Sequence, residues 1–199
     1  MKFPLRAIFL FTALSAPLAI PMANAPAVAA VNNQDPGQFI NTLAEDGFAA
    51  LRTGDHAGAR SRFRTLLAQH FAVDSIGDRL IRRWAPTITA EQRAAYKAAF
   101  PDFIVGTYAD RLFEYAHADL KVIRTIPSAT GVDVVSQVTR PGVAPITTVW
   151  SVQKEGGGYK VTNLKVAGVN LAISQTADFD SIIQRKGFDA LIKMMKSRG

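Results

Sequence analysis

The chain contains no cysteine among its 199 residues. A disulfide framework and a cysteine-ligated metal site are therefore excluded. A lipid-anchored N-terminal cysteine is excluded for the same reason. Histidine is scarce too: the three histidines, His56, His70 and His117, lie at neither HExxH nor HxH spacing. We therefore predict no metal site.

Motifs of catalysis and nucleotide binding are also missing. The sequence has no G-x-S-x-G nucleophile elbow and no G-x-G-x-x-G fingerprint. The glycines at 156–158 separate two strand-like stretches, which is typical of a hairpin turn. Asp102 and Asp110 fall on the polar face of an amphipathic stretch, where solvated charges are common. We therefore predict a binding protein that is not an enzyme, with no catalytic residues and no cofactor.

The first thirty residues have the pattern of a secretory signal peptide. Lys2 and Arg6 form a positive start, an apolar run follows over residues 7–20, and small residues come next. We expect cleavage close to Ala30, which leaves residues 31–199 as a single exported domain. The formal net charge is +7, and loss of the two basic residues leaves a modestly basic +5.

Residues 89–115 form the most strongly patterned stretch. Thr89 and Gln92 have the spacing of a capping box, which predicts a helix start. Apolar side chains then recur at every fourth residue and make one aromatic helix face: Tyr96, Phe100, Ile104, Tyr108 and Leu112, widened by Phe103 and Tyr115. Such a face requires a cover, either the protein core or a bound apolar ligand. Pro101 predicts a kink or a fresh helix start near Phe100.

The remaining pattern predicts helices, then a sheet, then helices. Helical spacing is present from Asp35 to Leu51, over residues 57–69, over residues 71–84, and after Gly168, with Ser174 expected as a cap. Stretches rich in Val, Ile and Thr, separated by glycine-containing turns, predict about four antiparallel strands near residues 120–126, 132–139, 145–154 and 159–167. The fold class is therefore α+β.

Three segments in order resemble the MlaC family, also called the toluene-tolerance auxiliary family. Residues 89–100 resemble its T-x-E-Q-x-x-x-Y/F-x-x-A-F helix. Residues 160–171 resemble a strand that ends in G-V/I-S-L/M, and 186–191 resemble K-G-(I/F)-D-x-L. Two departures are Pro101 inside the helix and Asn170 where the family usually has serine.

The resemblance implies a soluble periplasmic lipid carrier. In that family, helices pack on a curved antiparallel sheet and enclose an apolar cavity for phospholipid acyl chains. The implied cargo is a phospholipid, and the implied partners are an inner-membrane ABC lipid transporter and an outer-membrane lipoprotein complex. Two alternatives stay open: a carrier of hopanoids or other apolar lipids, as in one branch of the family, and a periplasmic adaptor that carries no lipid.

Lipid-binding residues are predicted on the aromatic helix and on both faces of the strands: Phe100, Phe103, Ile104, Tyr108, Leu112, Val134, Val149, Trp150, Val161 and Leu164. A basic docking face for the partner complexes is predicted from two arginine clusters: Arg60, Arg62 and Arg64, and Arg79, Arg82 and Arg83.

Overall fold

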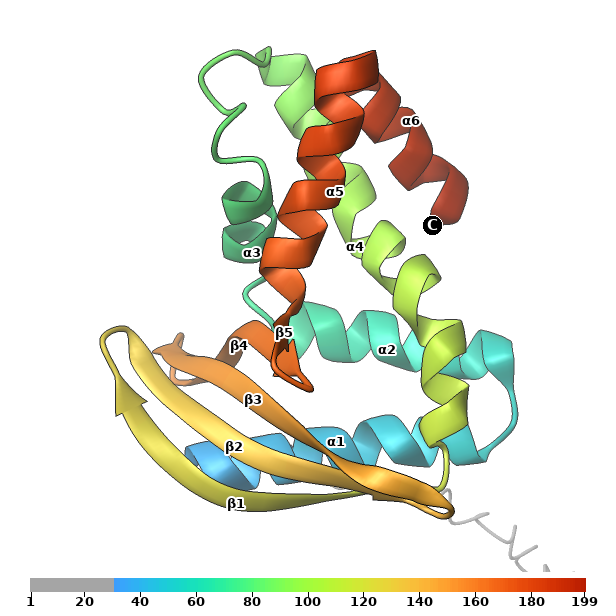
Figure 1. Ribbon diagram of the computed structural model, residues 1–199, viewed down its shortest axis with the longest axis vertical. Coiled ribbons are helices and arrows are strands. Elements are labelled where there is room, and N and C mark those ends of the chain that lie inside the picture. Colours follow the sequence, from blue (N-terminus) through green and yellow to red (C-terminus); the bar gives the residue numbers. More distant parts are fainter. Residues whose placement is uncertain (1–30) are drawn as a thin grey trace, which may run out of the picture.

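The computed structural model describes residues 31–199 (Figure 1). The predicted signal peptide lies outside the described residues. Four helices precede the sheet: α1 (Pro36–Arg52), α2 (His56–His70), α3 (Val73–Leu80) and α4 (Ala90–Leu112), the last followed by a short 3-10 turn, η1 (Phe113–Tyr115). Two more helices follow the sheet, α5 (Leu171–Lys186) and α6 (Phe188–Arg198). The α+β prediction is confirmed.

The sheet is a five-stranded antiparallel meander. It consists of β1 (Asp119–Ser128), β2 (Gly131–Arg140), β3 (Val143–Glu155), β4 (Gly158–Val166) and β5 (Val169–Asn170), paired in chain order. The first four strands were predicted, and the two-residue β5 was missed. Register shifts lie between Val122 and Arg124, between Val138 and Arg140, and between Ser151 and Val152. Bulges of this kind bend strands, and Figure 1 shows the sheet curving around α1.

Helix α4 begins as its sequence predicts. The Thr89 hydroxyl accepts from the Gln92 N–H, and the Gln92 side chain accepts from the Thr89 N–H, each at 3.1 Å. The helix then continues through Pro101, so of the two predicted outcomes the fresh start near Phe100 is wrong, and the kink stays a prediction. Proline removes only one N–H, the donor to the Lys97 carbonyl, and the flanking Phe100 and Phe103 are buried, so packing on either side of the proline favours a continuous helix.

Helix α5 starts earlier than predicted. The Asn170 side chain accepts hydrogen bonds from the N–H groups of Ala172 at 3.0 Å and Ile173 at 3.2 Å, so Asn170 is the N-cap and Ser174 is not. Asparagine and serine are both good caps, which explains how Asn170 can replace the usual serine of the family pattern. Gly187, at φ +83°, separates α5 from α6 as predicted.

The buried residues form two clusters. The first joins α3, α4, α5 and α6 and contains Tyr96, Phe103 and Phe179, each 0% exposed. The second joins α1 to the inner face of the sheet and contains Phe39 and Val134. Figure 1 shows the helices of the first cluster stacked above the sheet, with α2 crossing between the two parts.

Candidate lipid-binding cavity

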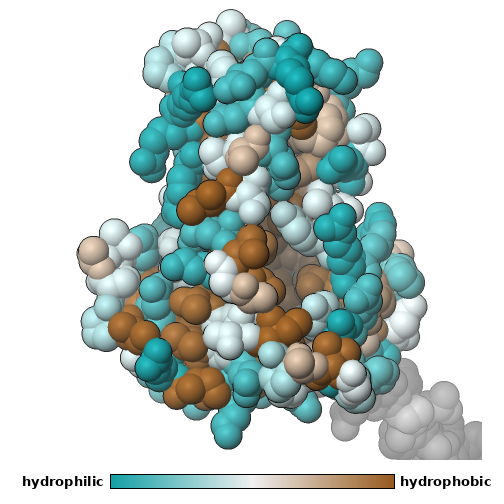
Figure 2. Space-filling view, in the orientation of Figure 1, coloured by the Kyte–Doolittle hydropathy of each residue, from teal (hydrophilic) through white to brown (hydrophobic). Residues whose placement is uncertain are grey.

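A cavity of about 470 Å³ lies between the two clusters. Its wall is built from α1, α2 and α3, the lower half of α4, the inner face of the sheet and the first turns of α5. Within the described residues, no Asp, Glu, Lys, Arg or His contributes to this wall. Figure 2 shows a hollow in the surface beside α5, with hydrophobic side chains at its rim. An apolar ligand therefore meets no buried charge there.

Seven of the ten predicted lipid-binding residues lie in the cavity wall: Phe100, Ile104, Tyr108, Leu112, Trp150, Val161 and Leu164. The other three do not. Phe103 packs against Phe179 with ring centroids 5.5 Å apart, and Val134 is buried against α1. Val149 alternates with Trp150 along β3 and lies on the opposite face of the sheet. Contact of the seven with lipid stays a prediction.

More residues of β4 line the cavity than the alternating side-chain directions of a regular strand allow. Val161, Thr162, Asn163 and Leu164 all line the cavity, although successive residues of a regular strand point to opposite faces. The register shift opposite Ser151 and Val152 places one extra residue in β4 here. The bulge therefore turns polar Thr162 and Asn163 toward a face that would otherwise take only alternate side chains.

Several polar groups of the wall are paired with one another or with the buried Ser136, whereas Asn163 Oδ1 has no partner among residues 31–199. The Ser136 and Thr148 hydroxyls lie 2.6 Å apart, and the Trp150 indole N–H donates to both at 3.0 and 3.1 Å. The Tyr108 hydroxyl donates to Gln175 Oε1 at 3.2 Å, and burial raises the pKa of Tyr108. Groups paired in this way place little demand on a ligand, so the wall behaves as an apolar surface.

The sequence prediction missed the contribution of the first helices. Ten further apolar wall residues come from α1, α2 and α3: Leu43, Ala44, Phe48, Leu51, Phe63, Leu66, Leu67, Val73, Ile76 and Leu80. Their helical spacing was visible, and it marked them as inward-facing. The sequence does not tell whether these residues face a filled core or a cavity, because an apolar helix face has the same spacing in both cases.

The arginines of α2 do not form a free basic face. Arg60 Nη2 lies 2.5 Å from Asp110 Oδ2, and Arg64 Nε lies 2.8 Å from Asp102 Oδ1, so both pair with α4. Hydrogen bonding to Arg60 lowers the pKa of Asp110. These ion pairs hold α2 against α4, where both helices line the cavity.

Arg62 makes a two-pronged ion pair with Asp46 of α1. Arg83 lies over the Trp84 ring and 4.0 Å from Asp180, whereas Arg79 lines a second pocket. The six arginines are therefore divided among different contacts, and the prediction that they share one docking face is not supported by their placement.

The described residues contain no group of three or more His, Asp or Glu side chains that could hold a metal ion. No helix within residues 31–199 is long and apolar enough to span a bilayer.

Comparison with known proteins gives one consistent result. The model of the family described as MlaC protein matches residues 38–197. The intermembrane phospholipid transport system binding protein MlaC of Haemophilus influenzae is 23% identical over 142 residues, which cover 69% of this chain and 66% of that protein, slightly less than two thirds. The solved structure of a phospholipid-binding protein from Ralstonia solanacearum, in complex with a phospholipid, is 22% identical, with a TM-score of 0.68 over 82% of this chain and 96% of that one. Because the family model spans most of the chain, this protein belongs to the MlaC family.

Proposed function

We propose that this protein is a periplasmic phospholipid carrier. The observation that carries the proposal is the 470 Å³ cavity, to whose wall residues 31–199 contribute no charged side chain. Burial of each acyl methylene contributes about 0.8 kcal/mol, so ten buried methylenes contribute roughly 8 kcal/mol before the cost of ordering the lipid is subtracted. A cavity of this kind retains a lipid without a covalent anchor or a cofactor. The names of the two relatives, both of which refer to phospholipid, support the choice of cargo.

The carrier proposal is tested on native protein by extracting bound lipid and identifying it by mass spectrometry. Purified wild type should yield phospholipid. Ile104→Glu places a carboxylate in the cavity wall, where desolvation costs several kcal/mol, and it should yield none while the protein stays folded. Ala98→Glu is the matched control, because Ala98 is exposed on the same helix.

The outcomes separate the alternatives. A sterol-like or hopanoid lipid in the wild-type extract would replace phospholipid as the cargo. A lipid-free wild type, together with an Ile104→Glu variant that unfolds while Ala98→Glu stays folded, would favour the adaptor, because Ile104 would then belong to a filled core. Full lipid retention by a folded Ile104→Glu variant would mean that the cavity is not the lipid site.

We further propose that lipid passes between an inner-membrane ABC transporter and an outer-membrane lipoprotein complex. Val169 and Ile173 support a transfer surface at the start of α5, because they are 53% and 69% exposed and adjoin the cavity-lining Leu171 and Ala172. Changing Val169, which lines neither pocket, to serine should slow lipid transfer to acceptor vesicles that carry the partner complexes, without reducing the lipid already bound. An unchanged transfer rate would place docking elsewhere.

A further inference from the structure

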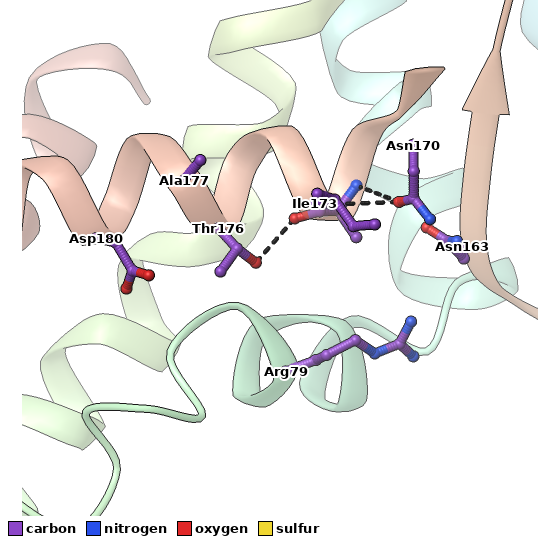
Figure 3. A pocket seen from close by; sticks show the side chains of 8 residues that line it. Arg79, Asn163, Asn170, Ile173, Thr176, Ala177 and Asp180 are labelled. Carbon is purple, nitrogen blue, oxygen red and sulfur yellow. Dashed lines mark hydrogen bonds between the residues drawn. The ribbon is translucent and has the colours of Figure 1, made fainter. Parts of the chain in front are cut away.

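A second, smaller pocket adjoins the apolar cavity. It has a volume of about 360 Å³, near the lower end of the roughly 300–1,000 Å³ usual for small-molecule sites. It lies between α3 and the first turns of α5 and is here named the side pocket (Figure 3). Asn163 and Ala172 line both spaces, so the side pocket opens where the apolar wall ends. An amphipathic molecule with its chains in the cavity would place its polar end here.

Arg79 is the single cation that the described part of the chain contributes to the side-pocket lining. Among residues 31–199 its side chain has no hydrogen bond or ion pair, in contrast to the paired Arg60, Arg62 and Arg64. In Figure 3 its side chain extends from α3 toward the end of the pocket that holds Asn163, while Asp180 lies further along α5. A guanidinium with free donors at the edge of an apolar site is suited to bind a phosphate.

The remaining charged and capping groups do not neutralise Arg79. Asp180 accepts from the Trp84 indole N–H at 2.6 Å and lies 4.0 Å from Arg83. The N–H groups of Ala172 and Ile173 at the start of α5 both donate to Asn170. From residues 31–199 the pocket therefore offers an anion one side-chain cation, and the N–H groups of Ala172 and Ile173 are already used.

Asn163 adds a second requirement for a ligand of the side pocket, namely a hydrogen-bond donor. Its Oδ1 is buried and has no hydrogen-bond partner among the described residues. A buried acceptor left unpaired is costly, so the site favours a ligand that brings an N–H or O–H donor to this atom. Asn163 lines both spaces and therefore lies at their junction.

We propose that the side pocket binds the phosphodiester head group of the cargo lipid, with Arg79 on the phosphate and Asn163 Oδ1 on a head-group donor. The ligand class is therefore a diacyl phospholipid whose head group carries N–H or O–H, such as ethanolamine or glycerol. Choline has neither an N–H nor an O–H group. The phosphate of a choline lipid would therefore bind Arg79, while Asn163 Oδ1 would stay unpaired. This inference rests on the proposed carrier function.

The test compares three lipids with identical oleoyl chains on delipidated protein: phosphatidylethanolamine, phosphatidylcholine and diacylglycerol. Wild type should bind them in that order of decreasing affinity. Arg79→Gln should weaken both phospholipids about tenfold, the change that corresponds to about 1.4 kcal/mol, and leave diacylglycerol unchanged. Arg82→Gln is the matched control, since Arg82 is exposed on the same segment and outside the pocket lining.

Asn163→Leu isolates the donor half of the site. It should remove the preference for ethanolamine over choline and preserve the preference of both over diacylglycerol. Inorganic phosphate alone, at the lipid concentration, should neither bind measurably nor displace phosphatidylethanolamine, because a free anion gains nothing from the cavity.

Each contrary outcome contradicts either the head-group site or the carrier function. If wild type binds all three lipids equally, the head-group site is wrong and the carrier function stands. If it binds none, the carrier function itself fails and the inference falls with it. Equal losses of phospholipid affinity in Arg79→Gln and Arg82→Gln would mean that the effect comes from the net charge of the protein and not from the side pocket. Binding of inorganic phosphate as tightly as phospholipid would make the side pocket a free-anion site.

Discussion

Tyr96 joins α4 to the end of α3 through one buried hydrogen bond. Its ring is 0% exposed and packs near Phe100 and Phe179, and its hydroxyl donates to the Gly77 carbonyl at 2.9 Å. Helix α3 ends at Leu80, three residues after Gly77. The Ile81 N–H, which would bond to the Gly77 carbonyl in a continuing helix, is directed to the Arg79 carbonyl instead. The tyrosine hydroxyl therefore supplies a donor to a helix end that lacks one.

Tyr96→Phe keeps the aromatic packing and removes only this donor. A buried carbonyl left without a partner costs about 1–3 kcal/mol, and each kcal/mol lowers Tm by roughly 2–4 °C for a domain of this size. We expect a lower Tm with unchanged lipid content, because Tyr96 is absent from the cavity wall. Thermal unfolding should be followed on delipidated protein, since bound lipid raises the apparent stability.

Tyr159→Phe is the control for removal of a tyrosine hydroxyl. Tyr159 is half-buried, and within the described part of the chain its hydroxyl makes no hydrogen bond. Its replacement should change Tm by less than about 1 °C. Equal Tm values for Tyr96→Phe and Tyr159→Phe would refute the reasoning that the hydrogen bond from Tyr96 to the Gly77 carbonyl completes the end of α3.

Three further predictions concern stability. Arg62→Ala should lower the free energy of unfolding more than Arg60→Ala in urea titrations, because the partner of Arg62, Asp46, is 5% exposed and the partner of Arg60 is 51% exposed. Asn170→Ala should cost about 1 kcal/mol through loss of the α5 cap, whereas Asn170→Ser should retain most of that stability. Burial, followed by the charge of a nearby lysine, lowers the pKa of His70 below 6.5. The unfolded chain then binds the extra proton more readily, so stability should fall as pH drops below about 6.5, and the fall should be smaller in His70→Gln.

The elements were predictable because they depend on local chemistry. The capping box at Thr89, the glycine at 187 and the Val- and Thr-rich strands each act within a few residues, and the structure confirms all of them. The two-residue strand β5 was missed because a pattern of period two cannot be recognised in so short a stretch.

Contacts between distant residues were not predictable. Arg60 and Arg64 resemble a solvated basic face in sequence, yet their carboxylate partners lie 50 and 38 residues away. The β4 bulge was equally hidden, because Thr162 and Asn163 are polar residues in a strand that was expected to alternate. The side pocket depends on that bulge together with the position of α3, so its residues could not be assembled from sequence alone.

Helix α4 shows why a single apolar stripe can serve two purposes. Its upper part, from Tyr96 to Phe103, is covered by α3, α5 and α6 and belongs to the core, and Phe100 lines the cavity as well. Its lower part, with Ile104, Tyr108 and Leu112, faces the cavity because α5 ends at the sheet and α6 turns back along α4. Gly106 permits that close approach, since a Cβ there would lie 1.7 Å from the Arg198 carbonyl oxygen. The helical period fixes which side chains share a face, whereas the lengths of the covering helices decide where the core ends and the cavity begins.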